Sequence, residues 1–200
     1  METRFKAVLF DIDGVLVDSE AANMANYKAI LEGFGYDVPL PRIKEAMLGN
    51  TTHRLFEMLA PESTPEMRDA MVAQVAKNVP YTFLEFRPTA ALESVPDISA
   101  DFLVAAVTNR RQSAYALLNH FGMLGYFSAI HTADSHEPKP SPEMMLAACE
   151  SLGVSPREAV FFGDNAVDAE AGRLAEIKTH IIGPACGRGE IFRLIGSGRG

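Results

Sequence analysis

The sequence predicts an α/β fold, with a doubly wound, mostly parallel, Rossmann-like sheet and an inserted α-helical domain. Three observations predict it. Continuous apolar runs alternate with helical spacing over residues 86–200, as in a parallel sheet covered by helices on both faces. Another apolar run lies near residue 10, and residues 16–85 show helical spacing without a competing strand pattern. We therefore expect a core domain of residues 1–15 and 86–200 and an inserted helical domain of residues 16–85.

The first part of the chain is expected to form one strand and then four helices. The strand is indicated by a solid apolar run, and the helices by apolar residues that recur every three or four positions. Asp18 or Ser19 is expected to cap the first helix, and Pro65 suits the first turn of the fourth. The expected bounds are a strand over 5–10 and helices over 19–35, 41–48, 52–59 and from Pro65 onward.

The second part alternates strands with helices. Each strand is a short apolar run, and the helices are bounded by proline or serine at the start and glycine near the end. The expected strands cover 102–107, 129–132, 159–162 and 179–182, and the expected helices cover 113–121, 141–153 and 166–174.

Composition excludes several classes of protein. The formal net charge is −8, so a nucleic-acid or anionic-membrane surface is not expected, and no segment is apolar enough to span a membrane. Cys149 and Cys186 are too few and too far apart for a disulfide framework or a zinc site. The first apolar run is too short for a signal-peptide core, so we expect a reducing, cytoplasmic setting.

Polar and charged side chains follow the strongest expected strands. They are Asp11 and Asp13 after the first strand, Thr108 and Asn109 after the second, Asp164 and Asp168 after the run at 159–162, and Lys139 in a loop before a helix. In a doubly wound sheet these loops meet at one edge. Four carboxylates there would repel each other unless a hard cation such as Mg²⁺ joined them. The pattern therefore predicts a Mg²⁺-assisted phosphoryl transfer through a covalent carboxyl phosphate.

Other interpretations of the same residues stay open. Asp11 and Asp13 could be an acidic turn, and Asp164 and Asp168 an exposed acidic start of a helix. An EF-hand is excluded, because its third ligand, glycine and final acid would fall on Val15, Leu16 and Ala22. The five histidines show no ligand spacing, and Arg110 and Arg111 are expected to be solvated, although either could approach a phosphorylated substrate.

These segments also carry a family resemblance. FDIDGVLVDSE, VTNR, KPSPEM and GDNAVD resemble the four ordered motifs of haloacid dehalogenase superfamily phosphatases, over about residues 5–182. The helical insert is similar to the cap domain of the phosphoglycolate phosphatase and β-phosphoglucomutase branch. The resemblance implies an aspartyl-phosphate mechanism with Mg²⁺ as cofactor.

By position, the resemblance also implies roles for individual residues. Asp11 would be the nucleophile and Asp13 the general acid/base, while the Asp13 carbonyl, Asp164 and Asp168 would complete the metal site with Asp11, and Thr108, Asn109 and Lys139 would bind the phosphate group. Dehalogenating relatives carry an aromatic residue in place of Asp13, which argues against carbon–halogen chemistry. Relatives usually have glycine after the last helix of the motif, where this chain has Ala175-Glu176-Ile177. We expect either a positive φ at Glu176 or a different helix end.

Substrate choice is expected to lie in the cap loop of residues 49–54, where His53 or Arg54 would meet the distal end of the ligand. The two crossings near 15–17 and 83–87 are expected to act as hinges. The loop does not match the mutase loop position by position, which favours hydrolysis over isomerisation.

The preferred function is hydrolysis of a small phosphorylated metabolite, such as phosphoglycolate or a sugar phosphate. The alternatives are a phosphomutase of the same family, a phospho-accepting receiver, and a binding or regulatory module without turnover. Chain order disfavours the receiver. The sequence makes no prediction of oligomeric state.

Overall fold

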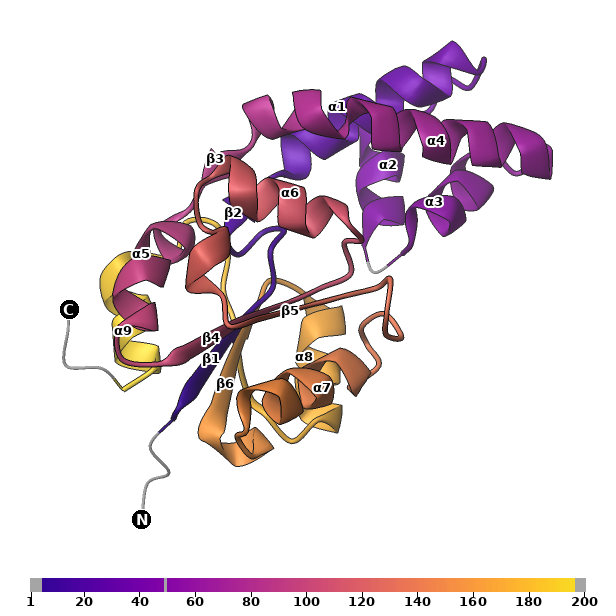
Figure 1. Cartoon of the computed structure of the whole chain (residues 1–200). Coiled ribbons are helices and arrows are strands. Elements are labelled where there is room, and N and C mark those ends of the chain that lie inside the picture. The colour runs from indigo at the N-terminus through magenta and orange to yellow at the C-terminus, as the bar shows by residue number, and fades with distance from the viewer. Residues whose placement is uncertain (1–4, 49, 197–200) are drawn as a thin grey trace. The chain divides into compact units, whose positions relative to one another are not determined.

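The computed structural model describes residues 5–48 and 50–196 and divides into two compact units (Figure 1). Met1–Asp18 and Arg87–Gly200 form the core unit, which contains the main sheet. Ser19–Phe86 form the cap unit, whose described secondary structure is helical.

The sheet of the core unit is parallel throughout, and this confirms the predicted fold class. Its order is β5-β4-β1-β6-β7. The strands are β1 (Ala7–Phe10), β4 (Leu103–Thr108), β5 (Ala129–Thr132), β6 (Ala159–Gly163) and β7 (Lys178–Ile181). β1 is central and fully buried, because its residues are covered on both faces and paired on both sides. Its last residue, Phe10, lies opposite Ala106 and Phe162, so three strands end close together at the carboxyl edge.

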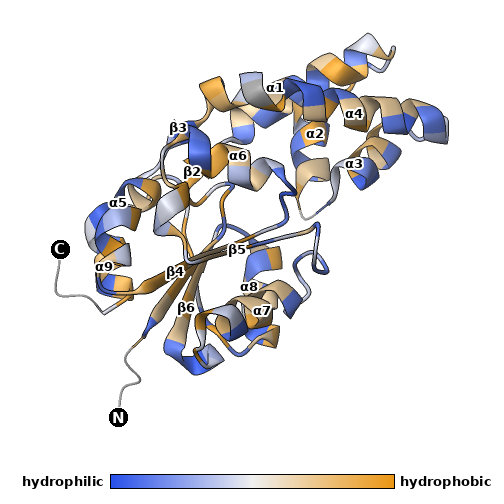
Figure 2. Ribbon diagram, viewed as in Figure 1, coloured by the Kyte–Doolittle hydropathy of each residue, from blue (hydrophilic) through white to orange (hydrophobic). Residues whose placement is uncertain are grey.

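Helices cover both faces of this sheet. They are α5 (Ala90–Ser99), α6 (Ser113–His120), α7 (Glu143–Leu152), α8 (Ala166–Leu174) and α9 (Arg188–Leu194), with short 3₁₀ turns at Leu124–Tyr126 and Pro156–Glu158. α5 and α9 lie on one side of the strands and α7 and α8 on the other (Figure 1). The three central strands β1, β4 and β6 are apolar (Figure 2), and they form the core together with the buried apolar residues of the covering helices.

Two core helices were not predicted from the sequence. α5 contains Pro96, which removes one backbone hydrogen bond and normally argues against a helix interior. Burial of Leu92, Val95 and Ile98 against the sheet outweighs that local preference. α9 is only seven residues long and follows a glycine-rich segment, so its pattern is too short to recognise. The expectation at Glu176 is confirmed, with φ at 56°.

The cap unit packs four helices around its own apolar cluster. They are α1 (Glu20–Gly33), α2 (Leu40–Met47), α3 (Thr52–Leu59) and α4 (Pro65–Thr82), followed by a 3₁₀ turn at Phe83–Glu85. Leu31, Phe56 and Met71 lie at the centre of the cluster. The side chains of Thr51 and Thr64 cap α3 and α4.

The first cap helix begins after Ser19, one of the two predicted capping residues, but without the expected capping bond. Ser19 holds the N-cap position of α1 without a capping hydrogen bond from its side chain, and Asp18 belongs to a strand. This strand, β2 (Val17–Asp18), pairs antiparallel with β3 (Arg87–Pro88). The ribbon brings the two ends of the cap unit together. It was not predicted, because two residues per strand carry no readable periodicity.

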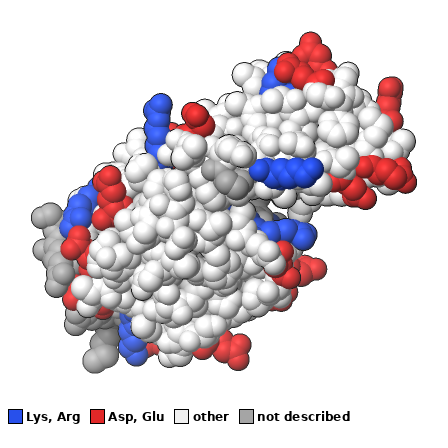
Figure 3. All heavy atoms as spheres, turned by 45° about the horizontal axis from the view of Figure 1, so that its top comes forward, with Lys and Arg blue, Asp and Glu red and all other residues white. Residues whose placement is uncertain are grey.

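The surface charges of the described residues are mixed. On the face seen in Figure 3, basic side chains lie near acidic ones and do not gather into one patch. Several of them form exposed ion pairs, such as Lys44 with Glu20 and Arg188 with Asp97. None of the helices in the described segments has the length and apolar character needed to cross a bilayer.

Candidate active site

Asp11 is the first residue after the central strand. Its backbone N–H donates to the Phe162 carbonyl at 2.9 Å, which continues the parallel ladder and fixes the position of Asp11. The residue is only 6% exposed. A carboxylate held this far inside needs a positive partner nearby.

Lys139 supplies part of that positive charge. Its Nζ lies 2.9 Å from Asp11 Oδ1 and 2.6 Å from Asp168 Oδ1, and it donates to the Val107 carbonyl at 3.1 Å. Asn109 holds the main chain of Lys139 from both sides, because its amide donates to the Lys139 carbonyl and its oxygen accepts from the Lys139 N–H. Asn109, predicted to bind substrate, is thus seen to position the loop that carries the lysine.

Asp164 and Asp168 come from the end of β6 and the first turn of α8. Asn165 caps this helix by accepting hydrogen bonds from the N–H groups of Val167 and Asp168. Asp168 in turn accepts from the Asp164 N–H at 3.0 Å, so the turn is locked by its own polar side chains. Asp168 is fully buried, so the alternative of an exposed acidic start of a helix is wrong for this residue.

Two glycines let the acidic residues approach the backbone. A Cβ on Gly14 would lie 2.0 Å from Asp164 Oδ2, and a Cβ on Gly163 would lie 2.3 Å from the Asp168 Cβ. Gly14 also has a φ of +77°. Any side chain at either position would push an acidic residue out of place.

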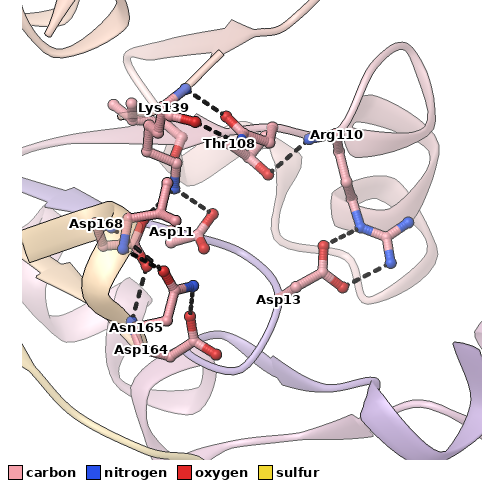
Figure 4. A network of polar contacts seen from close by, with 11 residues as sticks. Asp11, Asp13, Thr108, Arg110, Lys139, Asp164, Asn165 and Asp168 are labelled. Carbon is pink, nitrogen blue, oxygen red and sulfur yellow. Dashed lines mark hydrogen bonds and ion pairs between the residues drawn. The ribbon is translucent and has the colours of Figure 1, made fainter. Parts of the chain in front are cut away.

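The carboxylates Asp11, Asp164 and Asp168 form one group, seen from close by in Figure 4. One oxygen from each lies within 4.8 Å of the other two. Burial raises the pKa of Asp11 to about 7, although Lys139 opposes the shift, and burial together with Asp168 raises the pKa of Asp164 to about 6. Burial also works to lower the pKa of Lys139, but Asp11 and Asp168 outweigh it and hold that pKa above its ordinary value. Three carboxyl groups thus lie close together beside one lysine.

These acidic residues fit a hard divalent cation. Asp11 Oδ1 and Asp168 Oδ1 are buried, and both face the single ammonium of Lys139, at 2.9 Å and 2.6 Å. Clustered carboxylate oxygens with unused lone pairs are the donor set that Mg²⁺ and Ca²⁺ prefer.

Asp13 lies apart from this group. Its carboxylate accepts two hydrogen bonds from Arg110, one from Nε at 2.5 Å and one from Nη2 at 2.7 Å (Figure 4). The Arg110 side chain is only 13% exposed, so the expectation that Arg110 is solvated is wrong. The reason is that Thr108, which is itself buried, accepts from the Arg110 N–H at 3.1 Å and turns this residue toward Asp13. A contact between residues 97 positions apart leaves no signal in the local sequence.

The two residues predicted for substrate choice belong to the cap unit. His53 and Arg54 lie in the first turn of α3. Arg54 pairs with Glu57 at 2.5 Å, and His53 Nε2 lies 3.6 Å from Asp69 Oδ1. Both side chains are more than half exposed. Their role in binding stays a prediction, and Gly49 of the same loop lies outside the described residues.

The fold and the acidic site at the sheet edge define a hydrolase class. Residues 8–182 match the family of haloacid dehalogenase-like hydrolases, and the chain belongs to this family. The resemblance of the four motifs is thereby confirmed, and so is the prediction of an enzyme of the phosphatase kind.

Individual relatives span most of the chain. Phosphoglycolate phosphatase of Aquifex aeolicus is 29% identical over 184 residues, which cover 87% of this chain and 83% of that protein. A pyrophosphatase of Halalkalibacterium halodurans is 31% identical over 192 residues, which cover 92% and 86%. The structure of β-phosphoglucomutase from Clostridium difficile is similar with a TM-score of 0.81 at 18% identity, over 96% of this chain and 97% of that one. At that identity the likeness shows the fold alone.

Proposed function

We propose that this protein is a Mg²⁺-dependent phosphatase that hydrolyses a small phosphorylated metabolite through a phosphorylated Asp11. The observation that carries the proposal is the position of Asp11. It is buried at the end of the central strand, 2.9 Å from the Lys139 ammonium and within a group of three carboxylates. The family membership and the names of the relatives support the same chemistry.

In the first step, an Asp11 carboxylate oxygen attacks the phosphorus of a phosphomonoester. The bond between phosphorus and the ester oxygen breaks, and the leaving oxygen takes a proton from Asp13. Lys139 lies beside the nucleophile and reduces the repulsion between the carboxylate and an anionic substrate. The Thr108 hydroxyl ends the neighbouring strand and is proposed to bind a phosphoryl oxygen.

The proposed metal site consists of Asp11, Asp164 and the Asp13 carbonyl, with Asp168 supporting it directly or through water. A bound Mg²⁺ would neutralise charge on the carboxylates and on the phosphoryl oxygens. Asp168 also ties the start of α8 to Lys139, so it orders the site in addition to any role as a ligand.

In the second step, water attacks the phosphorus of the aspartyl phosphate. Asp13 accepts the proton of that water, the bond between Asp11 and phosphorus breaks, and inorganic phosphate leaves. Asp11 returns as a free carboxylate. The cycle needs no further reactant and leaves both acidic residues as they began.

The proposed substrate class is a phosphoglycolate-like acid or a sugar phosphate. Relatives of similar identity include a phosphoglycolate phosphatase and a pyrophosphatase, so the reaction type is shared more widely than the substrate. We propose that residues of the cap unit, His53 or Arg54, make the choice.

The test is a panel of phosphorylated metabolites assayed for release of inorganic phosphate with Mg²⁺ and with a chelator. We expect release from at least one small phosphomonoester with Mg²⁺, loss with chelator, and recovery when Mg²⁺ is restored. No bisphosphate activator should be needed. Isomerisation without phosphate release, or hydrolysis that persists in chelator, would contradict the proposal.

A further inference from the structure

Arg110 joins two segments that lie far apart in the sequence. Its backbone sits between Thr108, which accepts from its N–H, and Ala133, whose N–H donates to its carbonyl at 3.2 Å. Its side chain then reaches the carboxylate of Asp13 in the loop that follows β1. Arg110 is therefore held by hydrogen bonds at its backbone as well as at its guanidinium.

The loop that carries Asp13 is also fixed in its backbone. Gly14 donates to the Val17 carbonyl at 2.8 Å, and Leu16 donates to the Ile12 carbonyl at 2.9 Å. With the main chain held, the remaining freedom of Asp13 is the rotation of its side chain. A two-point contact with a planar guanidinium restricts that rotation more than a single hydrogen bond would.

The same fork geometry occurs elsewhere on the molecule, and the contrast is informative. Arg173 also contacts Glu170 through Nε and Nη2, at 2.7 Å each. That pair spans three residues of one helix, and the Arg173 side chain is 66% exposed. Such an exposed pair contributes little to the stability of a folded protein. The Arg110 pair is long-range, its arginine side chain is only 13% exposed, and it contacts the residue assigned to proton transfer.

We propose that Arg110 is a positioning residue that holds the Asp13 carboxylate in the orientation needed for proton transfer to the leaving group. This inference rests on the proposed function, because it assigns Asp13 the acid/base role. The contact fixes the direction of the Asp13 carboxylate through both of its oxygens. Positioning of this kind affects only steps in which Asp13 moves a proton.

The test compares two substrates that differ in their need for a proton on the leaving oxygen. One is the best alkyl phosphate from the metabolite panel, and the other is p-nitrophenyl phosphate, whose leaving group departs without protonation. The value of kcat/KM reports the steps up to leaving-group departure. Arg110→Ala should lower kcat/KM for the alkyl phosphate by about 10²-fold, the loss typical of a misplaced catalytic group, and change the aryl phosphate little.

Three controls separate positioning from other roles. Arg110→Lys keeps the charge but not the fork, and should recover part of the alkyl phosphate rate. Arg111→Ala removes a neighbouring arginine whose side chain is 71% exposed, and should leave the ratio of the two substrates unchanged. Inhibition by inorganic phosphate should be the same for Arg110→Ala and the natural protein, because positioning of Asp13 does not involve binding of phosphate.

A double variant completes the design. In an Asp13→Asn background, Arg110→Ala should cause no further loss for the alkyl phosphate. Equal losses for both substrates, weaker inhibition by phosphate, faster turnover of the alkyl phosphate, or a full additional loss in the Asp13→Asn background would each overturn the inference. Absence of hydrolysis by the natural protein on every substrate would instead overturn the proposed function.

Discussion

The two units of the chain place their charged side chains in opposite surroundings. In the core unit, Asp11, Lys139 and Asp168 are each at most 6% exposed and contact one another. In the described part of the cap unit, no charged residue is buried, and His53 and Arg54 pair with acids of their own unit. Burial of charge opposes folding unless the charges are paired, and even then it contributes little to stability, so a buried charged cluster favours a functional role. The difference fits the proposed division, in which the core unit carries the chemistry and the cap unit selects the substrate.

The largest effect is expected from loss of the nucleophile. Asp11→Asn removes the oxygen that attacks phosphorus, so hydrolysis of an aryl phosphate should fall by more than about 10³-fold. The fold should persist by circular dichroism, because the amide fills the same space. Asp97→Asn, which alters an exposed acid paired with Arg188, is the matched control and should retain full activity. Wild-type rates for Asp11→Asn would refute the nucleophile assignment.

Loss of the proposed acid/base residue, Asp13, should also lower turnover severely, but by less than loss of Asp11. Asp13→Asn is expected to lower turnover of an alkyl phosphate by about 10²–10⁴-fold, the usual contribution of a general acid/base. Steady-state rates on the alkyl phosphate measure this effect. A change of less than tenfold would show that another group transfers the proton.

Gly14→Ala tests the close approach of Asp164. The added Cβ would meet Asp164 Oδ2 at 2.0 Å, so the Mg²⁺ concentration that gives half-maximal activity should rise by about 10–100-fold. Gly35→Ala in the cap unit is the matched control, because Gly35 has a similar φ of +88° but no described neighbour within 4 Å of its Cβ position. The control separates backbone strain from displacement of the acid. Equal effects of the two changes would mean that strain alone matters.

The pH dependence of stability should reflect the buried acids. Unfolded Asp11 and Asp164 lose their protons near pH 3.8, whereas in the fold their pKa values are about 7 and about 6. The unfolded chain therefore binds fewer protons between these limits, so without metal this site makes the fold less stable as the pH rises from about 4 to 7.

Mg²⁺ at the proposed site would bind the ionised carboxylates, so it should reverse this loss. Differential scanning fluorimetry should show that Mg²⁺ raises Tm by about 5 °C at pH 8 and by less at pH 5. The Asp11→Asn variant should show a smaller difference between the two pH values. A larger Mg²⁺ effect at pH 5 would contradict the metal assignment.

The smallest effects are expected in the cap unit. His53→Ala and Arg54→Ala remove exposed side chains with local ion pairs, so Tm should change little. We expect the order of preferred metabolites to change, with KM rising by up to about tenfold, which corresponds to 1.4 kcal/mol of binding free energy. Unchanged kcat and KM for every substrate in both variants would exclude these residues from substrate choice.

Much of the fold could be predicted from the pattern of apolar residues in the sequence. The central strands β1, β4 and β6 are apolar runs, and Thr52–Leu59, Ala129–Thr132 and Ala166–Leu174 have the bounds that spacing predicts. α5 was missed because Pro96 contradicts a helix locally while burial of its apolar face decides in favour of one. Short elements such as β2 and α9 carry too few residues for a periodic signal.

Some features of the candidate site could likewise be predicted from the sequence, whereas others could not. Asp11, Asp164 and Asp168 could be predicted to meet because each follows a strand that ends at one edge of a parallel sheet. The pair of Arg110 with Asp13 could not, because it depends on the side-chain directions of two distant loops. Asn109 was predicted as a polar strand ending, but its hold on the Lys139 main chain depends on a loop conformation that spacing does not reveal.

The ribbon formed by β2 and β3 means that the cap unit starts and stops at neighbouring points of the backbone. A segment whose ends adjoin can be lengthened, shortened or replaced without rerouting the rest of the chain. On the proposed roles, reactivity would lie in the core unit and selectivity in the cap unit, which are separate segments of the chain. A related protein that keeps the same reactive groups could then act on a different substrate after exchange of one continuous segment, Ser19–Phe86.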